Sequence, residues 1–371
     1  METPFYRYDL SLLRQTLQTA VKASSIIPSC KIHYAVKANC NPEILREVAA
    51  AGIGADCVSA GEIMQALQAG INPRDIVYSG VAKTDSEIIL AMEKGIGCLN
   101  VESLEELRVI SSLAVKAGRS VRVALRVNPD VDAHTHSNIT TGLAENKFGI
   151  NMEMVPGAVD AALSLGGIDF HGLHFHIGSQ ILDMDVFAAL CEKINSLQEF
   201  LSSRGVKLHS IDVGGGLGVD YQNPDENPVA DFESYFQTFA RNLRLQPGQE
   251  FHCEPGRSLV AQCGTLVSRC IYVKQGTRKK FVILDAGMND LIRPALYQAY
   301  HKIDNLSNPM AETEVYDVVG PVCESSDTFA EDRALPRTTR GDIIAIRSAG
   351  AYGESMASTY NSRPLPQSEF V

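Results

Sequence analysis

The sequence predicts an α/β fold, a (β/α)8 TIM barrel, together with a C-terminal all-β domain that is itself barrel-like. Short apolar or β-branched segments alternate with amphipathic ones up to Glu254, and the first four recur about every 22 residues, the length of one βα unit. After Glu254 the pattern changes to strands joined by turns, with little helix. Eight repeats over roughly 220 residues suit a barrel, whose usual size is about 250 residues. A doubly wound open sheet stays possible, because periodicity alone does not exclude it.

The expected elements follow one another in a regular order. In the helix that starts after the first barrel strand, Asn41 is the predicted N-cap and Pro42 the first helical residue. Ser103 and Glu106 match a capping box. We expect barrel strands near 31–36, 54–58, 76–79, 98–101, 121–127, 170–176, 210–213 and 250–254, and β-domain strands near 4–9, 259–273, 280–285, 314–319 and 342–347.

Bulk composition narrows the functional classes. The net charge of −11 argues against a nucleic-acid surface, which needs clustered Lys and Arg. The N-terminus has no apolar signal core, and no stretch approaches the roughly 18 apolar residues of a membrane span. The nine cysteines are scattered without a CxxC pair. We therefore expect a reduced, cytoplasmic protein with no membrane or nucleic-acid partner.

Two charged residues directly follow expected strands, at the end of the barrel where barrel enzymes hold their active sites. Lys37 ends His33-Tyr-Ala-Val-Lys-Ala-Asn39, where partial burial would favour the neutral amine that forms an imine. Glu254 follows the eighth strand, and a carboxylate there would keep a pyridine nitrogen protonated. A solvated lysine and a structural acid are the alternatives.

A glycine run and a histidine pair add to this pattern. Gly214-Gly-Gly-Leu-Gly218 follows the seventh strand, where barrels often bind phosphate, although a tight turn without a ligand is equally consistent. His174 and His176 lie on one strand face. A ring stacked on an aromatic cofactor, or a packed core histidine, is favoured over a metal site because no third ligand stands at a telling spacing. No metal is expected.

Together these motifs resemble the fold-type III pyridoxal-phosphate-dependent decarboxylase family. The given sequence ends soon after the last of these motifs, so a final β-domain strand is uncertain. Segment 133–138 is interpreted as an active-site lid. The resemblance implies a barrel over 28–248, and a β domain over 1–27 and 249–371 that contributes substrate and dimer contacts. The segments that carry it are 33–39, 142–149, 174–179, 214–218, 254–257, 291–297, 323–326, 349–352 and 360–361.

The resemblance also implies pyridoxal 5'-phosphate as cofactor and a homodimer with shared active sites. Lys37 would be the Schiff-base lysine, His176 would stack on the ring and Glu254 would pair with its nitrogen. Cys323 would donate the proton to the carbanion, in the partner's site. Implied cofactor contacts are Lys37, His176, Gly214, Gly215, Gly216, Gly218, Glu254, Gly256, Arg257 and Tyr352; implied substrate contacts are Arg257, Arg293, Tyr297, Glu324 and Tyr352; Asp56 and Arg126 match supporting positions.

Charge matching favours meso-2,6-diaminopimelate as the substrate and L-lysine as the product, the last step of lysine biosynthesis. Its distal end carries an ammonium and a carboxylate, which suit Glu324 and the forked guanidinium groups of Arg257 and Arg293. A decarboxylase of ornithine, arginine or carboxynorspermidine is the alternative. A non-catalytic regulator is a further one, opposed by the retained lysine, phosphate loop and cysteine. A racemase would favour a cation where Glu254 stands.

Overall fold

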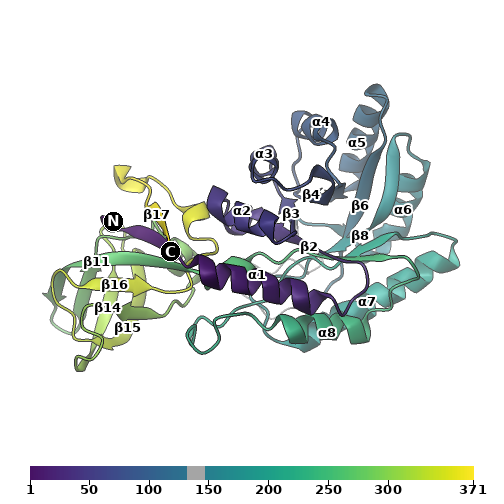
Figure 1. The fold of residues 1–371 in the computed structure, drawn as a ribbon. Helices are drawn as coiled ribbons and strands as arrows, with labels where there is room; N and C mark the ends of the chain where they lie inside the picture. The colour runs from purple at the N-terminus through teal and green to yellow at the C-terminus, as the bar shows by residue number, and fades with distance from the viewer. Residues whose placement is uncertain (132–146) are drawn as a thin grey trace. The chain divides into compact units, whose positions relative to one another are not determined.

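The computed structural model describes residues 1–131 and 147–371, which form two units (Figure 1). The barrel unit comprises residues 17–218 and 231–256, and the β unit comprises residues 1–16, 219–230 and 257–371. The expected boundary at 248 thus differs from the observed one. The eighth barrel strand lies beyond it, at Glu250–Cys253, and its pairing with strands on both sides keeps it in the barrel unit.

Eight parallel strands form a closed ring in the barrel unit. Their order is β5-β4-β3-β2-β10-β9-β8-β6, and pairing of β5 with β6 closes the ring, which excludes the open doubly wound sheet. All eight predicted barrel strands are confirmed. They are β2 (Cys30–Ala35), β3 (Gly54–Cys57), β4 (Ile76–Tyr78), β5 (Cys98–Val101), β6 (Val121–Asn128), β8 (Ile168–Phe175), β9 (Ser210–Asp212) and β10 (Glu250–Cys253), with the short β7 (Ile150–Asn151) beside β6.

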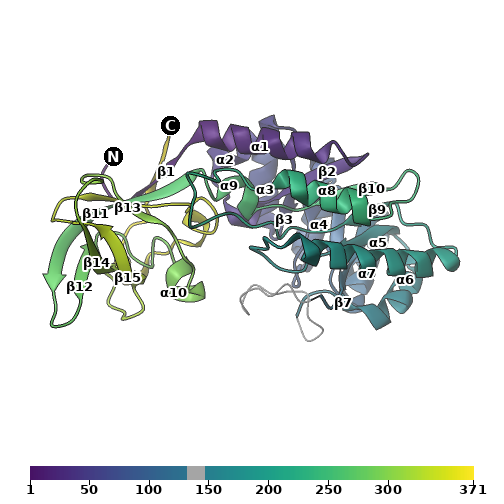
Figure 2. The ribbon, with the colours of Figure 1, turned by 90° about the horizontal axis from the view of Figure 1, so that it is seen from below.

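Helices cover the outside of this ring, and neighbouring helices contact one another around it (Figure 2). The division between the two units falls within the first helix. Among the described residues, no helix has the length and apolar character that a membrane crossing requires. The helices are α1 (Leu10–Ser24), α2 (Pro42–Ala50), α3 (Ala60–Gln68), α4 (Asp85–Lys94), α5 (Leu104–Lys116), α6 (Val155–Ser164), α7 (Met184–Ser203) and α8 (Phe232–Asn242).

The two predicted helix starts differ in outcome. The Asn41 side chain accepts the Glu43 N–H at 3.0 Å, which confirms the N-cap of α2. The capping box at α5 is wrong in its second half. Ser103 Oγ accepts the Glu106 N–H at 3.2 Å, but the Glu106 carboxylate bonds the Glu102 N–H and the Lys83 ammonium instead. The ion pair with Lys83 holds the Glu106 side chain in that position.

The β unit contains an eight-stranded sheet with the order β13-β16-β11-β12-β14-β15, and β1 joins β11 to β17. The predicted strand near residues 4–9 is confirmed, whereas the one expected at 259–273 begins later because α9 (Arg257–Val260) is helical. A final strand does form. The strands are β1 (Phe5–Tyr8), β11 (Gly264–Gln275), β12 (Lys280–Leu284), β13 (Ile303–Asn305), β14 (Thr313–Val319), β15 (Thr328–Pro336), β16 (Ile343–Ile346) and β17 (Gln367–Phe370), and the unit also holds α10 (Arg293–Tyr297).

Glycine on β3 makes room for a histidine in the barrel. A Cβ at Gly54 would lie 2.2 Å from the Asp75 carbonyl oxygen and 2.8 Å from His33 Nδ1. That ring nitrogen lies 3.1 Å from the same carbonyl, so the His33 N–H donates to it. The narrow spacing between β3 and its neighbours is therefore part of how the barrel positions His33.

We expect Gly54→Ala to destabilise the protein by about 3 kcal/mol, because the new methyl group overlaps backbone that cannot move aside. Gly157→Ala is the matched control. It lies in α6 with nothing within 4 Å of the added Cβ, and it should stabilise by about 0.5–1 kcal/mol. Denaturant unfolding measures both. Equal stability of the two variants would contradict the role given to Gly54.

Candidate active site

The expected site residues fall in both units. Segment 133–138 and most of the 142–149 motif lie outside the described residues. The barrel unit holds Lys37, His176, Gly214, Gly215, Gly216, Gly218, Glu254 and Gly256, and the β unit holds Arg257, Arg293, Tyr297, Cys323, Glu324 and Tyr352.

Lys37 lies in a 3-10 turn (Val36–Ala38) directly after β2. Its Nζ is 3.4 Å from Oδ2 of Asp56, at the end of the adjacent strand β3. The lysine side chain is 40% exposed, whereas that of Asp56 is fully buried. Burial and the nearby charge of Glu254 raise the pKa of Asp56, and the lysine ammonium opposes that rise. The amine thus sits beside an acid and reaches solvent.

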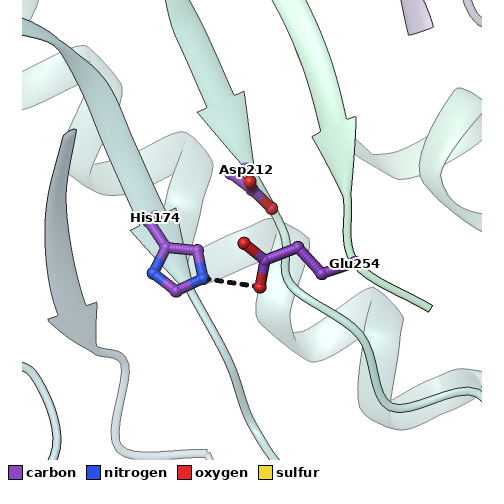
Figure 3. Close-up of side chains that lie close together, drawn as sticks. All are labelled: His174, Asp212 and Glu254. Carbon is purple, nitrogen blue, oxygen red and sulfur yellow. Dashed lines mark hydrogen bonds and ion pairs between the residues drawn. The ribbon is translucent and has the colours of Figure 1, made fainter. Parts of the chain in front are cut away.

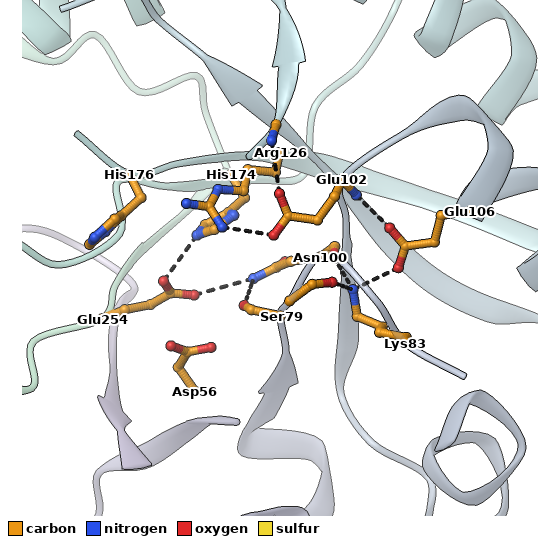
Figure 4. A network of polar contacts seen from close by, with 12 residues as sticks. Asp56, Ser79, Lys83, Asn100, Glu102, Glu106, Arg126, His174, His176 and Glu254 are labelled. Carbon is orange, nitrogen blue, oxygen red and sulfur yellow. Dashed lines mark hydrogen bonds and ion pairs between the residues drawn. The ribbon is translucent and has the colours of Figure 1, made fainter. Parts of the chain in front are cut away.

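Glu254 follows β10, which pairs with β2, so it belongs to the same end of the barrel as Lys37. Its Oε2 accepts a hydrogen bond from His174 Nε2 at 2.9 Å, and its Oε1 accepts one from Asn100 Nδ2 at 3.2 Å (Figure 4). Burial alone would raise the pKa of the Glu254 carboxyl. The hydrogen-bonded His174 ring and the Lys37 charge outweigh burial and lower that pKa below its usual range. Glu254 is therefore a buried carboxylate.

Two side chains, those of His174 and Asp212, lie beside this carboxylate (Figure 3). One side-chain nitrogen or oxygen atom of each of His174, Asp212 and Glu254 lies within 4.8 Å of the others. The fold therefore brings two acids close to His174 that no sequence spacing pairs with it. Asp212 and Asn100 were missed altogether. Their only sequence signal is an inward position near the end of a short apolar strand.

His176 lies one residue beyond β8. Its Nδ1 accepts the Gly215 N–H at 3.2 Å, which assigns the ring proton to Nε2. Burial, followed by the positive charges of Arg126 and Lys37, lowers the pKa of His176 well below its usual value. The ring is therefore neutral at physiological pH, a state suited to stacking on an aromatic group.

The glycine run lies so close to neighbouring backbone that two of its positions have no room for a side chain. A Cβ at Gly214 would lie 2.2 Å from the Phe175 carbonyl oxygen, and one at Gly215 would lie 2.4 Å from that of Glu254. The N–H groups of Gly214, Gly215 and Gly218 bond Asp212, His176 and Ile181. Among the described residues, Gly216 is the glycine of this run whose N–H stays available to an anion.

A buried ion-pair chain supports the same end of the barrel (Figure 4). Arg126 Nη1 donates to Glu102 Oε1 at 2.7 Å, and the Glu102 N–H donates to Glu106 at 2.7 Å. Lys83 Nζ joins Glu106 at 2.7 Å and the Asn100 carbonyl at 2.6 Å. The chain therefore links Arg126 to Asn100, which contacts Glu254.

The β unit brings two buried arginines around one tyrosine. Arg257 Nη1 donates to Tyr221 Oη at 2.7 Å, and the guanidinium of Arg293 lies 4.8 Å from the Tyr221 ring centre. Burial would raise the pKa of Tyr221, but the two guanidinium charges lower it. Arg293 Nε is buried without a partner, and within the described chain Arg293 forms no ion pair with a carboxylate. This positively charged cluster suits an anionic group.

The remaining β-unit residues lie in different settings. The Tyr352 ring centre is 4.9 Å from the Arg257 guanidinium. Burial would lower the pKa of Arg257, but Tyr221, followed by Tyr352 and Tyr297, raises it. Cys323 and Glu324 are exposed. Their loop is tied to residues 360 and 361, because Glu324 accepts from the Tyr360 hydroxyl at 2.6 Å and the Cys323 N–H donates to Asn361 at 2.9 Å.

His301 fixes Arg293 and gives the protein a specific acid sensitivity. Its Nδ1 donates to the Arg347 carbonyl at 2.8 Å, so its Nε2 accepts from Arg293 Nη1 at 2.7 Å. Burial and the charge of Arg293 lower the pKa of His301 to about 3. In the unfolded chain it titrates near its ordinary value of about 6.5, so the unfolded state binds more protons between these values and stability falls as pH drops.

We expect the wild type to lose about 2 kcal/mol more stability than His301→Asn between pH 7 and pH 5, because the asparagine does not titrate. Unfolding free energies of both proteins, measured across this range, test the prediction. Other histidines contribute to both proteins alike. Parallel pH dependences would show that His301 accepts a proton in the folded state.

Comparisons with known proteins place the chain in a family. The family model for the pyridoxal-dependent decarboxylase, pyridoxal binding domain, matches residues 13–261. The chain belongs to the pyridoxal-dependent decarboxylase family. The resemblance stated from the motifs is thus confirmed.

The full-length relatives agree with this assignment. A diaminopimelate decarboxylase from Bacteroides thetaiotaomicron is 56% identical over 99% of this chain and 95% of its own length. One from Helicobacter pylori J99 is 45% identical over 98% and 89% of the two chains. The crystal structure of Helicobacter pylori diaminopimelate decarboxylase complexed with L-lysine superposes with a TM-score of 0.94 at 43% identity, covering 100% of this chain and 92% of that one.

Proposed function

We propose that the chain decarboxylates meso-2,6-diaminopimelate to L-lysine and carbon dioxide with pyridoxal 5'-phosphate, the last step of lysine biosynthesis. The observation that carries the proposal is the carboxylate of Glu254, kept ionised at the same barrel end as the amine of Lys37. The names and full-length identity of the relatives support the choice of substrate.

The residues present fit this cofactor. Glu254 is a buried anion that can hold a pyridinium proton, and the neutral ring of His176 suits an aromatic face. Oδ1 of Asp56 and Nδ1 of His174 are buried and have no hydrogen-bond partner. The site therefore has hydrogen-bonding capacity that a bound polar group can use. Gly216, Gly256, Arg257 and Tyr352 are the proposed phosphate contacts. The bound cofactor supplies an electron sink for the electrons that the departing carboxylate leaves behind.

The chain's own residues provide the chemistry around that sink. Asp56 holds the Lys37 ammonium, and a proton must leave this amine before it can act as a nucleophile. His174 and Asn100 orient Glu254, so its charge is in place before the reaction starts. His176, fixed by the Gly215 N–H, excludes water from one face of the cofactor position.

The buried arginine cluster is the proposed carboxylate site for the substrate, together with Tyr297. Arg293 has an unpartnered Nε and no carboxylate within the described chain, so a substrate carboxylate would complete it. Glu324 would accept from the distal ammonium. A substrate without the distal carboxylate would leave a buried guanidinium unpaired, at a cost of about 1–3 kcal/mol.

We also propose a cytoplasmic homodimer in which each chain lends Cys323 and Glu324 to the partner's site. The exposure of both residues on their own chain supports this, since a loop that serves a partner must be accessible. Cys323 would then deliver the proton to the carbon that loses carbon dioxide.

We expect the purified protein to release L-lysine from meso-diaminopimelate, and Lys37→Ala to lose at least about 1,000-fold in kcat, as loss of a covalent-catalysis residue typically does. Mass analysis of products, with borohydride trapping to locate the cofactor attachment, measures both. A parallel panel of ornithine, arginine and carboxynorspermidine tests specificity. Clear preference for ornithine would overturn the substrate proposal, and full activity of Lys37→Ala would overturn the chemistry.

The shared active site predicts complementation between inactive chains. Lys37→Ala and Cys323→Ala should each be inactive alone. Equal mixtures, unfolded and refolded together, should recover about one quarter of wild-type activity, because half of the dimers are mixed and each restores one site of two. Recovery no greater than either variant alone would show that Lys37 and Cys323 act from the same chain.

A further inference from the structure

We propose that Asp212 is a positioning residue that stays protonated in the folded protein and donates its proton to Glu254. The inference deepens the proposed function, because Glu254 is the residue proposed to face the ring nitrogen. It begins from the cluster in Figure 3, where Asp212 and Glu254 lie side by side at the carboxyl ends of adjacent strands.

Hydrogen bonding assigns the role of each Asp212 oxygen. The Gly214 N–H donates to Oδ1 at 2.9 Å, so this oxygen acts as an acceptor. The second carboxyl oxygen is then the one left to carry a proton, and a side-chain oxygen of Asp212 lies within 4.8 Å of one of Glu254. Two ionised carboxylates this close together in a buried site repel each other, so one of the pair holds a proton.

The surroundings decide which acid is neutral. Glu254 already accepts from His174 at 2.9 Å and from Asn100 at 3.2 Å, and donors of this kind favour the ionised form. Asp212 has one backbone donor and is 4% exposed. Burial and the charge of Glu254 raise the pKa of Asp212 well above its usual value. The proton therefore belongs to Asp212.

Groups from the other elements around Asp212 agree with this arrangement. Asp56 on β3 is a third buried acid, whose negative charge also opposes ionisation of Asp212. Lys37 and His176 act on Glu254 from the side of the proposed cofactor. On its other side, Asp212 lines a cavity of about 20 Å³ together with His33 and His252. That volume admits a water molecule, which gives the carboxyl a route for proton exchange.

A carboxylate has about four lone-pair positions. In this arrangement the hydrogen bonds from His174, Asn100 and Asp212 fill three positions on Glu254, which leaves one for an external N–H. Asp212 thereby both stabilises the Glu254 charge and restricts the direction in which it can accept.

Infrared difference spectra of the apoprotein test the protonation state without substrate or cofactor. Asp212→Asn keeps an acceptor for Gly214 and a donor for Glu254, so it mimics the neutral acid. At pH 7 the wild-type minus Asp212→Asn spectrum should show the carbonyl band of one protonated carboxyl group. Asp160→Asn, at an exposed acid on α6, should show only a lost carboxylate. A lost carboxylate at Asp212 would overturn the proposal.

Two further measurements keep the test decisive. With cofactor bound, Asp212→Ala should move the acid limb of the absorbance titration up by about one pH unit, since Glu254 loses a donor, and Asp212→Asn should move it less. Equal shifts in the two variants would show that Asp212 has only a structural role, and would overturn the proposal. If Asp212→Asn does not fold, carbon-13 NMR of labelled aspartate in the wild type should show an acid that stays protonated from pH 5 to 8, and its absence would overturn the proposal.

Metal analysis tests the alternative that a bound divalent ion, and not a shared proton, holds the two carboxyl groups together. A stoichiometric divalent ion in the purified protein would explain the close carboxyl groups without a shared proton, and would overturn the inference. Failure of the proposed function would look different, because a protein without activity on diaminopimelate could still show the neutral Asp212 in its infrared spectrum.

Discussion

Glu254 must remain charged inside a barrel that gives it little water, and much of the surrounding structure follows from that requirement. An isolated carboxylate would take up a proton instead of staying buried and ionised. His174 on β8 and Asn100 on β5 donate to it from two strands that flank β6 in the ring. Asn100 is in turn held by Lys83, whose ammonium is paired with Glu106. The charge at one atom is thus maintained by strands and helices that are far apart in the sequence.

The two units meet different electrostatic demands. The barrel unit gathers acids, with Asp56, Asp212 and Glu254 in one buried region and Lys37 as the cation beside them. The β unit gathers Arg257 and Arg293 with neutral partners. An acidic region suits a protonated ring nitrogen, and a cationic one suits a carboxylate. The two units therefore differ in the sign of the charge that each one buries.

The features that depend on local sequence pattern are predictable from the sequence. Each barrel strand is a short apolar run, and residues that end such runs, including Lys37 and Glu254, could be placed at one end of the barrel before any coordinates. Asn100 and Asp212 could not, because polar residues inside short strands are indistinguishable from surface residues until closure of the ring brings β5, β9 and β10 together. The Glu106 side chain was misassigned for a related reason, since Lys83 lies 23 residues away and outcompetes the local capping partner. Helix α9 covers the first two residues of an expected strand, Leu259 and Val260, whose apolar side chains fit either element.

The pairing of β1 with β17 has a consequence for biosynthesis. Phe5 lies opposite Gln367, and the last residue, Val371, exchanges backbone hydrogen bonds with Tyr8 and Leu10. β1 therefore cannot pair with β17 until the segments between them have been synthesised. The parallel barrel can assemble during that interval from neighbouring segments, whereas the sheet of the β unit is completed only once β17 has been synthesised.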